Sequence, residues 1–418
     1  MTSIGDDLHP GGATAPYPTR FREAEARGRR LGRPLRVVGR VHEVDEGLMH
    51  RIGQAFWRCD PVGQRLADAM RLRAGDSGRV TMSMFRTALA EGLEAVPQAP
   101  EALVDFLTTV EATPSWIDWE LLARGQRVYH RLGQNAGDVL LQLSLIGGYR
   151  FGGPTDLLVA TGGLTGDSTV RRLGETQKWA TALSVPDGLR RDGEAWRLTV
   201  HVRAMHALVN SSFADQWDVQ HWGVPINQAD QAATLGLFDG VVLLGSRALG
   251  VPVSRAESRA LMHLWKYVGW LMGVDEEFLV DTEQERHRLN YHVLLAQADI
   301  SEAGPLLSQA IVDAQTTLHY ENAARVRGIF ERERLLSMLT VFLGPASMRE
   351  LGLPLRPPWA PFYIGLLNTW RYRTPWGRRG LDAWGDRVRA RILGRYFGAS
   401  EPEVAHLPAP TPEKAPQP

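Results

Sequence analysis

Hydrophobic residues recur three and four positions apart along most of this 418-residue chain, which is the spacing that places them on one face of an α-helix. Alternation of apolar and polar residues, the mark of a half-buried β-strand, is scarce. The sequence therefore predicts an all-α protein. The ranges with helical spacing are Met49–Leu72, Pro97–Glu111, Ile117–Leu132, Gly137–Ile146, Ser168–Ala182, Trp196–Phe213, Gln228–Leu249, Ser254–Leu271, Pro305–Ile329 and Glu331–Leu343.

Capping residues support the starts of several of these helices. Asp60-Pro61, Ser168, Asn227 and Ser254 each precede an apolar run, and Ser254 with Glu257 has the spacing of a capping box. By contrast, both ends of the chain lack periodicity. Residues 1–20 and the Pro-rich residues 401–418 are predicted to be disordered, and residues 21–400 to form a single domain with its core at about residues 50–345.

Composition narrows the possible functions. The 47 basic and 47 acidic side chains cancel, so the chain lacks the net positive charge that attracts nucleic acid. Cys59 is the single cysteine, which excludes disulfide scaffolds, thiolate zinc sites, iron–sulfur clusters and covalently attached haem.

Membrane and export signals are weak. The first residues show no basic segment followed by an apolar one, and the most apolar run, Gly236–Val253, contains Asp239 and Arg247. We therefore expect a cytoplasmic protein without a membrane span. The Arg-rich segment Arg371–Arg395 is interpreted as the solvated end of an amphipathic helix and not as a membrane anchor.

A polar stripe runs down the predicted helix Trp196–Phe213. Thr199, Arg203, His206 and Asn210 lie at offsets 0, 4, 7 and 11, and the rest of the helix is largely apolar. Buried polar groups need partners, and a neutral imidazole offers a lone pair without burying charge. His206 is thus either a metal ligand or a hydrogen-bonded core histidine.

A second polar face lies on the predicted helix Ser168–Ala182. Arg172, Glu175, Thr176 and Trp179 lie at offsets 0, 3, 4 and 7, so Arg172 and Thr176 stack one turn apart as a pair of donors. The alternative is a surface helix in which Glu175 pairs with Arg171 or Arg172.

Other metal and catalytic patterns fit poorly. A di-iron carboxylate bundle needs Glu-x-x-His on two helices, and this spacing occurs only at Glu403–His406, in the tail. No zinc-protease, serine-hydrolase or phosphate-loop motif occurs. What remains is a helical protein with one candidate axial histidine and a polar helix to face it, the minimum for a b-type haem.

Four ordered motifs resemble a known family. They are Arg172-x-x-Glu175-Thr176, Arg203-Ala-Met-His206, Trp222-Gly-Val-Pro-Ile-Asn-Gln-Ala-Asp230 leading to Thr234, and Leu264-Trp-Lys-Tyr-Val-Gly-Trp-Leu-Met-Gly-Val274, with Phe56-x-x-x-Asp60-Pro61 upstream. This series resembles the family that unites bacterial latex clearing proteins (rubber oxygenases) with MpaB-like fungal oxygenases. The resemblance implies a globin-like helical core with flanking helices around a non-covalent b-type haem, and an oxygenase that uses O₂ to cleave a carbon–carbon double bond.

The resemblance also implies roles for individual residues. His206 would be the axial iron ligand, with Arg203 and Thr234 beside the cofactor. Arg172 and Thr176 would lie on the distal side, where donors steer O₂.

The chain departs from the rubber-oxygenase pattern at three points. Glu175 replaces a lysine and Asn210 an arginine, while the distal glutamate has only Asp156 and Glu175 as candidate counterparts. Together with the missing export signal, these departures favour a small hydrophobic isoprenoid or lipid-like substrate inside the cell over rubber.

Two other classes of function stay open. A globin-like haem protein that senses or carries O₂ or electrons without turnover would need the same axial histidine and donor pair. A haem-free helical protein with a structural or partner-binding role would keep His206 as a core residue. The sequence makes no prediction about oligomeric state.

Overall fold

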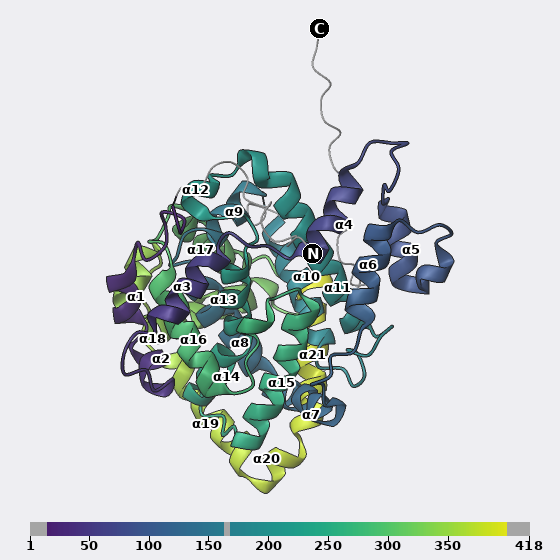
Figure 1. Cartoon of the computed structure of the whole chain (residues 1–418). Helices are drawn as coiled ribbons and strands as arrows, with labels where there is room; N and C mark the ends of the chain where they lie inside the picture. Colours follow the sequence, from purple (N-terminus) through teal and green to yellow (C-terminus); the bar gives the residue numbers. More distant parts are fainter. Residues whose placement is uncertain (1–14, 163–167, 399–418) are drawn as a thin grey trace.

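The computed structural model describes residues 15–162 and 168–398, and every regular element within them is a helix (Figure 1). The predicted all-α class is confirmed. The amino-terminal third contains α1 (Glu25–Leu31), α2 (Arg33–Val38), α3 (Glu46–Ala55), α4 (Pro61–Arg71), α5 (Met82–Glu91), α6 (Glu101–Glu111) and α7 (Trp119–Leu132). The middle contains α8 (Gln134–Val139), a π-helix (Leu140–Ile146), α9 (Pro154–Ala160), α10 (Ser168–Ala182), α11 (Glu194–Phe213), α12 (Val219–Trp222), α13 (Gln228–Phe238), α14 (Gly240–Ala248) and α15 (Arg255–Leu271).

The remaining helices complete the chain toward its carboxyl end. They are α16 (Glu283–Ala296), α17 (Ala303–Ala314), α18 (Ala324–Glu350), α19 (Trp359–Arg373), α20 (Pro375–Arg379) and α21 (Leu381–Phe397). In Figure 1, α19 and α20 form the lower tip of the molecule, and α21 lies beside α10 and α7. Among the described residues, none of these helices has the length and apolar character needed to cross a membrane.

Local capping chemistry sets several helix starts as expected. The Asp60 side chain accepts from the Val62 amide at 3.2 Å, and Asn227 accepts from the Asp230 amide at 2.8 Å. Ser254 caps α15 in the predicted capping box with Glu257.

Two predicted long helices are wrong, because each is broken in the middle. Met49–Leu72 divides into α3 and α4 because Asp60 precedes a proline and takes an extended conformation (φ −69°, ψ 109°). Gln228–Leu249 divides into α13 and α14 at Asp239, whose carboxylate forms a fully buried ion pair with Arg286 at 2.7 Å. The first break was visible in the sequence, whereas the second depends on a tertiary partner.

The region after residue 305 also differs from the prediction. The expected helix Pro305–Ile329 is interrupted between α17 and α18, where Ala323 adopts a left-handed conformation (φ 47°). The expected helix Glu331–Leu343 lies inside α18, which kinks at Gly344 before Pro345. Helices α16 and α19 were not predicted, because α16 buries polar and apolar side chains on all sides and α19 has apolar residues on opposite faces.

The predicted disorder of residues 1–20 is wrong for residues 15–20. Arg20 is fully buried, and its guanidinium pairs with Asp230 of α13 at 2.5 Å. The backbone of Thr19 also donates to the carbonyl of Gln220 at 3.0 Å. Residues 1–14 and 401–418 lie outside the described residues.

Two hydrophobic clusters form the interior. The larger one is built mainly from α3, α4, α6, α7, α11, α13, α14, α15 and α16, with Trp196 and Trp265 among its largest fully buried side chains. The smaller one packs the π-helix against α17 and α18. Helix α10 joins them, since Leu173 belongs to the smaller cluster and Trp179 to the larger.

A partly buried glutamate, Glu283, connects α14, α15 and α16. The Glu283 carboxylate accepts from Ser258 at 2.6 Å, hydrogen-bonds with His287 Nε2 at 3.2 Å and pairs with Arg247. Burial raises the pKa of Glu283, but these three hydrogen bonds outweigh it and lower the pKa to about 2.

This pKa predicts a pH-dependent contribution to stability. As pH falls, Glu283 becomes protonated in the unfolded chain near its ordinary pKa of 4.5, whereas in the folded chain it stays ionised until the pH approaches its lowered pKa of about 2. The contribution is therefore complete above pH 4.5 and is lost as pH falls toward 2. We expect Glu283→Gln to lower the free energy of unfolding at neutral pH, and the gap from the native chain to narrow across this window in urea titrations.

Glu276→Gln provides the control, because Glu276 is exposed. We expect this variant to stay parallel to the native chain at every pH. A Glu283→Gln gap that remained constant down to about pH 3 would contradict the assignment.

Candidate functional site: an unpartnered histidine on α11

Helix α11 presents a strip of partly exposed side chains that contains His206. The rest of the helix faces the protein interior, and its buried residues include Trp196, Val200 and Ala204. Apolar residues one turn apart flank the imidazole along the strip, and His201, which contacts Phe85, lies on the adjoining edge of the helix. The strip consists of Leu198, Val202, Met205, His206 and Val209.

The imidazole of His206 has a ring nitrogen without a partner. Its Nδ1 is buried and makes no hydrogen bond with any described group. Burial lowers the pKa of His206 to about 4, against a smaller opposing effect of the Asp60 charge, so the ring is neutral at physiological pH. A buried, unpaired nitrogen is costly and calls for an explanation, and a neutral imidazole is the form that binds metals.

The guanidinium of Arg203, one turn before His206, is buried and hydrogen-bonded. Its Nε and Nη2 donate to the two carboxylate oxygens of Asp60 at 2.6 and 2.8 Å, and both side chains are buried. The guanidinium also lies 5.6 Å from the ring centre of Phe106. The structure thus joins Arg203 to Asp60, two motifs 143 residues apart, and shows how Arg203 orients α11.

The same network extends to the end of α15 and the start of α13. Gln228 donates to the carbonyl of Gly273 at 2.8 Å and accepts from the Asp275 amide at 2.8 Å. A Cβ at Gly273 would lie 2.7 Å from the Asp60 carboxylate and 2.8 Å from Arg203 Nε, and Gly273 has φ +80°. Glycine is therefore required there for the ion pair to pack.

Trp179 of α10 marks the point where four helices meet. Its indole Nε1 donates to Thr199 Oγ1 of α11 at 2.9 Å. Its ring also packs edge-on against Phe238 of α13 at 5.3 Å and Trp265 of α15 at 5.9 Å between ring centres. This aromatic cluster therefore connects α10 with α11, α13 and α15.

The other predicted residues share helix faces with members of this aromatic cluster. Arg172, Glu175 and Thr176 share the Trp179 face of α10, His206 lies two turns beyond Thr199, and Thr234 lies one turn before Phe238. Thr176 and Thr234 are exposed, and Arg172 and His206 are only partly buried. The predicted residues thus lie on three helices that meet at Trp179.

Each predicted polar residue has a defined setting. Thr176 donates to the Arg172 carbonyl at 3.0 Å, and Thr234 donates to the Asp230 carbonyl at 2.8 Å. Both bonds are local to a helix, and a hydroxyl can rotate away from them toward a ligand.

The two candidate bases are both held by neighbours. Glu175 lies 3.8 Å from Arg171, as the surface-helix interpretation predicted. Asp156 caps α9, accepting from the Gly153 amide at 2.8 Å and from Ser301 at 3.0 Å. Asp156 is thus occupied as a structural residue, and Glu175 is paired within its own helix.

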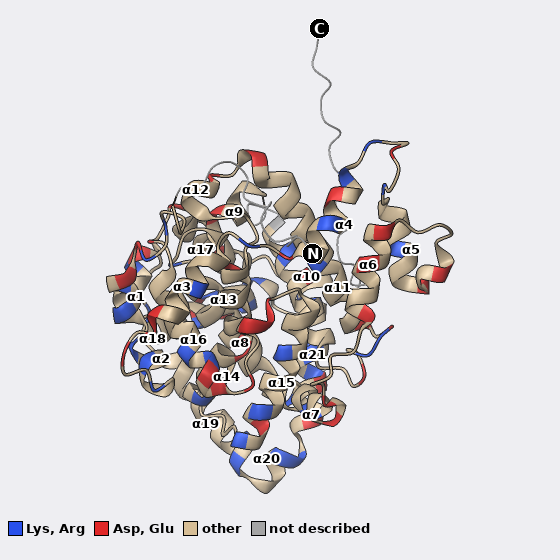
Figure 2. Ribbon diagram, in the orientation of Figure 1, with Lys and Arg blue, Asp and Glu red and all other residues tan. Residues whose placement is uncertain are grey.

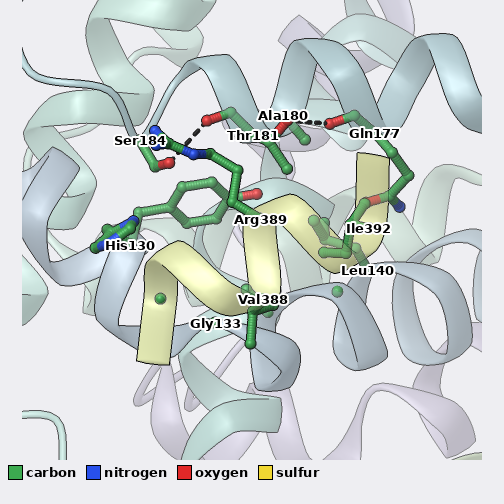
Figure 3. Close-up of a pocket in the computed structure, with 14 residues that line it drawn as sticks. His130, Gly133, Leu140, Gln177, Ala180, Thr181, Ser184, Val388, Arg389 and Ile392 are labelled. Atoms are coloured by element: carbon green, nitrogen blue, oxygen red, sulfur yellow. Dashed lines mark hydrogen bonds between the residues drawn. The ribbon is translucent and has the colours of Figure 1, made fainter. Parts of the chain in front are cut away.

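A small cavity lies on the opposite side of α10. It has a volume of about 40 Å³, and Figure 3 shows Gln177 and Thr181 of α10, with Ser184 just after that helix, facing Val388 and Ile392 of α21 around it. These α10 residues point away from the Arg172 and Thr176 face. The cavity is therefore distinct from the candidate site around His206.

The residues around His206 fit an axial haem ligand. A porphyrin supplies four nitrogen ligands, so a single imidazole is enough to hold its iron, and an apolar strip suits the flat hydrophobic macrocycle. In residues 15–162 and 168–398, no three His, Cys, Asp or Glu side chains gather as metal ligands. The unpartnered Nδ1 and the neutral state of His206 are the features that match such a group.

The fold and the site define an all-α protein whose helix α11 carries a histidine with an unpartnered ring nitrogen. Comparison with known proteins shows which of them share this fold. The solved structure of latex clearing protein LCP in its closed state superposes with a TM-score of 0.56 over 79% of this chain and 88% of that one, at 19% sequence identity. This similarity shows a shared fold.

Residues 130–372 match the family described as the catalytic domain of ER-bound oxygenase mpaB/B' and rubber oxygenase. The chain belongs to this family. A rubber oxygenase from Streptomyces sp. (strain K30) is 21% identical over 270 residues, which are 62% of this chain and 64% of the relative, so the match spans less than two thirds of that protein. Asp60 lies outside the matched range, although its partner Arg203 lies inside it.

Sequence reasoning missed the aromatic cluster and the connections of Asp60. Trp179 was noted only as a member of a helix face, and Phe238 was not singled out. The signal for the cluster was Trp179 next to the polar pair at helical spacing. The signal for Asp60 was its occurrence in a motif together with Arg203, but only the fold brings the two within 2.6 Å.

The Arg203–Asp60 pair yields a stability prediction. Removing one partner leaves the other as a buried, uncompensated charge, so Arg203→Met should lower the free energy of unfolding by about 3–5 kcal/mol in urea titrations. Asp60→Asn, which keeps a capping side chain, should cost a similar amount. The double variant should cost clearly less than the sum, which a double-mutant cycle measures.

Arg58→Met is the matched control. Arg58 is exposed and pairs with Glu277 at the surface, so its loss should cost less than about 1 kcal/mol. Additive costs for Arg203→Met and Asp60→Asn would show that the buried pair does not act as a unit.

Proposed function

We propose that this protein is a b-type haem oxygenase that uses O₂ to oxidise or cleave a carbon–carbon double bond of a hydrophobic, isoprenoid or lipid-like small molecule. The observation that carries the proposal is the buried, unpartnered Nδ1 of His206 on an apolar strip, in a chain that belongs to an oxygenase family. When bound, haem iron would supply the centre at which O₂ is activated.

His206 would hold the iron in this proposal. Its neutral state leaves a lone pair free for a metal, and its helix is held in orientation by the Arg203–Asp60 ion pair on a neighbouring face. Arg203 then acts as a positioning residue one turn from the ligand. Thr234 of α13, exposed on its helix, would contact the cofactor from a second side.

Arg172 and Thr176 would serve as donors toward the reacting oxygen. They lie on the face of α10 that also carries Trp179, and Trp179 is bonded to α11. Donors that are preorganised where negative charge develops lower the barrier of a reaction, because they need little rearrangement. Glu175, ion-paired with Arg171 on the same helix, would add a carboxylate near this edge.

The partly exposed apolar residues of α11 suit a hydrophobic substrate. Val202, Met205 and Val209 offer contact area without polar groups that would need partners. Such a surface excludes water and binds an alkene chain by burial alone.

Replacing the axial ligand tests the cofactor. We expect the purified protein, supplied with haem, to show a Soret band and about one iron per chain, and His206→Ala to lose the axial-ligand spectrum and most of the bound haem. His201→Ala is the matched control, because His201 lies on the same helix five residues earlier and contacts Phe85. Absence of haem binding in the native chain, or full retention in His206→Ala, would refute the proposal.

Replacing a distal donor tests the chemistry separately from the cofactor. Thr176→Val should leave haem binding unchanged and slow O₂ consumption, measured with a panel of isoprenoids and unsaturated lipids, by roughly a hundredfold. Thr181→Val is the control, because Thr181 makes the same kind of bond to the carbonyl four residues earlier but faces the other side of α10.

Two results would change the assignment. Loss of haem from Thr176→Val would show that this face does not lie on the distal side. Stable O₂ binding without any product from the whole panel would favour the sensor or carrier that the sequence left open.

A further inference from the structure

Helix α19 exposes large apolar side chains along its outer face. Phe362, Leu366 and Trp370 follow one another every four residues and are 76%, 71% and 56% exposed. Trp376 on the adjoining α20 is 75% exposed. We call these four residues the apolar tip, and the helices that carry them, α19 and α20, lie at the lower end of the molecule in Figure 1.

The apolar tip is not a by-product of core packing. The inner face of α19 is a separate set of residues, among which Ala360 and Ile364 are buried in the larger cluster. Isolated exposed apolar residues are common on protein surfaces, but a continuous row with two tryptophans marks a binding surface.

The charge around the apolar tip has one sign. From Leu351 to Leu381 the sequence contains five arginines and no acidic residue, although the whole chain has no net charge. Arg356 pairs with Glu333, and Arg371 stacks on Trp384. The exposed arginines of the set are Arg373, Arg378 and Arg379, and Figure 2 shows basic residues on α20 at the same end of the molecule.

This combination identifies the kind of partner. We propose that the α19–α20 tip docks on the surface of an anionic lipid bilayer, with the apolar tip inserted among the acyl chains near the headgroups and the three arginines on lipid phosphates. Tryptophan favours the membrane interface, and each surface arginine is attracted by anionic lipid. A symmetric pairing of two copies would instead bring arginines of both tips together, which is unfavourable.

The docking is peripheral. Helix α19 would lie along the bilayer surface, with its buried face still on the protein core, as amphipathic surface helices do. Within the Arg371–Arg395 segment, which the sequence predicted to be solvated, only the residues of α20 and the end of α19 would join the interface, whereas α21 packs against α7 and α10. The inference rests on exposed residues far from His206 in the sequence, and it stands whether or not the proposed function is correct.

Vesicle binding tests the proposal with the full chain. We expect it to sediment with vesicles of equal parts phosphatidylcholine and phosphatidylglycerol, and much less with pure phosphatidylcholine. Phe362→Ser with Leu366→Ser should weaken binding at least about tenfold, because the loss of apolar contact removes insertion. Arg373→Glu with Arg378→Glu and Arg379→Glu should abolish the preference for anionic lipid.

A variant that lacks the two tip tryptophans but keeps the apolar surface tests lipid contact by fluorescence, without relying on a variant that could misfold. Brominated lipids should quench the emission of the native chain, and Trp370→Phe with Trp376→Phe should lose this quenching while it still sediments with vesicles. That result requires contact between these two side chains and lipid, because phenylalanine preserves the apolar surface.

A second basic and apolar surface supplies the matched control. Arg30 and Arg33 near α1 and α2 are exposed, and Val37 beside them is 76% exposed. We expect Arg33→Glu with Val37→Ser to bind vesicles like the native chain. The proposal is overturned if this control variant loses binding while the tip variants keep it, if no vesicle binding occurs, or if the tip variants only dissociate a dimer in sedimentation velocity.

Discussion

The buried ion pair between Arg203 and Asp60 is the constraint on which the candidate site depends. Two oppositely charged groups removed from water cost free energy unless they meet in good geometry, and here both carboxylate oxygens accept from one guanidinium at 2.6 and 2.8 Å. This requirement fixes the rotation of α11 against α4. Because His206 lies one turn further along α11, the same rotation turns its imidazole toward the apolar strip.

The two faces of α11 therefore differ in how their polar groups are paired. The face toward α4 and the end of α15 is polar and fully partnered, with Gly273 leaving room for the ion pair. The strip with His206 is apolar and carries a nitrogen that no described group satisfies. A protein interior normally pairs its polar groups, so the contrast between the two faces is what points to a ligand at His206. Trp179 then sets the position of α10 and its donors relative to this helix.

The candidate site and the apolar tip each place a group in surroundings that do not suit its polarity. At His206, an apolar environment keeps an ionisable group neutral, whereas at the tip apolar side chains meet water beside exposed arginines. Both arrangements cost free energy in the isolated chain. A cofactor or hydrophobic ligand relieves the first cost and a lipid surface the second, so both features are interpreted as binding sites.

The periodicity and capping residues of the chain were enough to predict the all-α class, the bounds of α10 and the stripe on α11, because helical spacing and end signals are local. The motif order was enough to indicate the family. Only the tertiary structure could show that Asp60 pairs with Arg203, that Asp239 breaks a continuous apolar run by pairing with Arg286, and that α19 leaves Phe362 in water. These outcomes depend on which distant residue packs against each position. A buried charge requires a specific partner, and a helix face stays exposed only when no other element covers it. The sequence of a single helix determines neither.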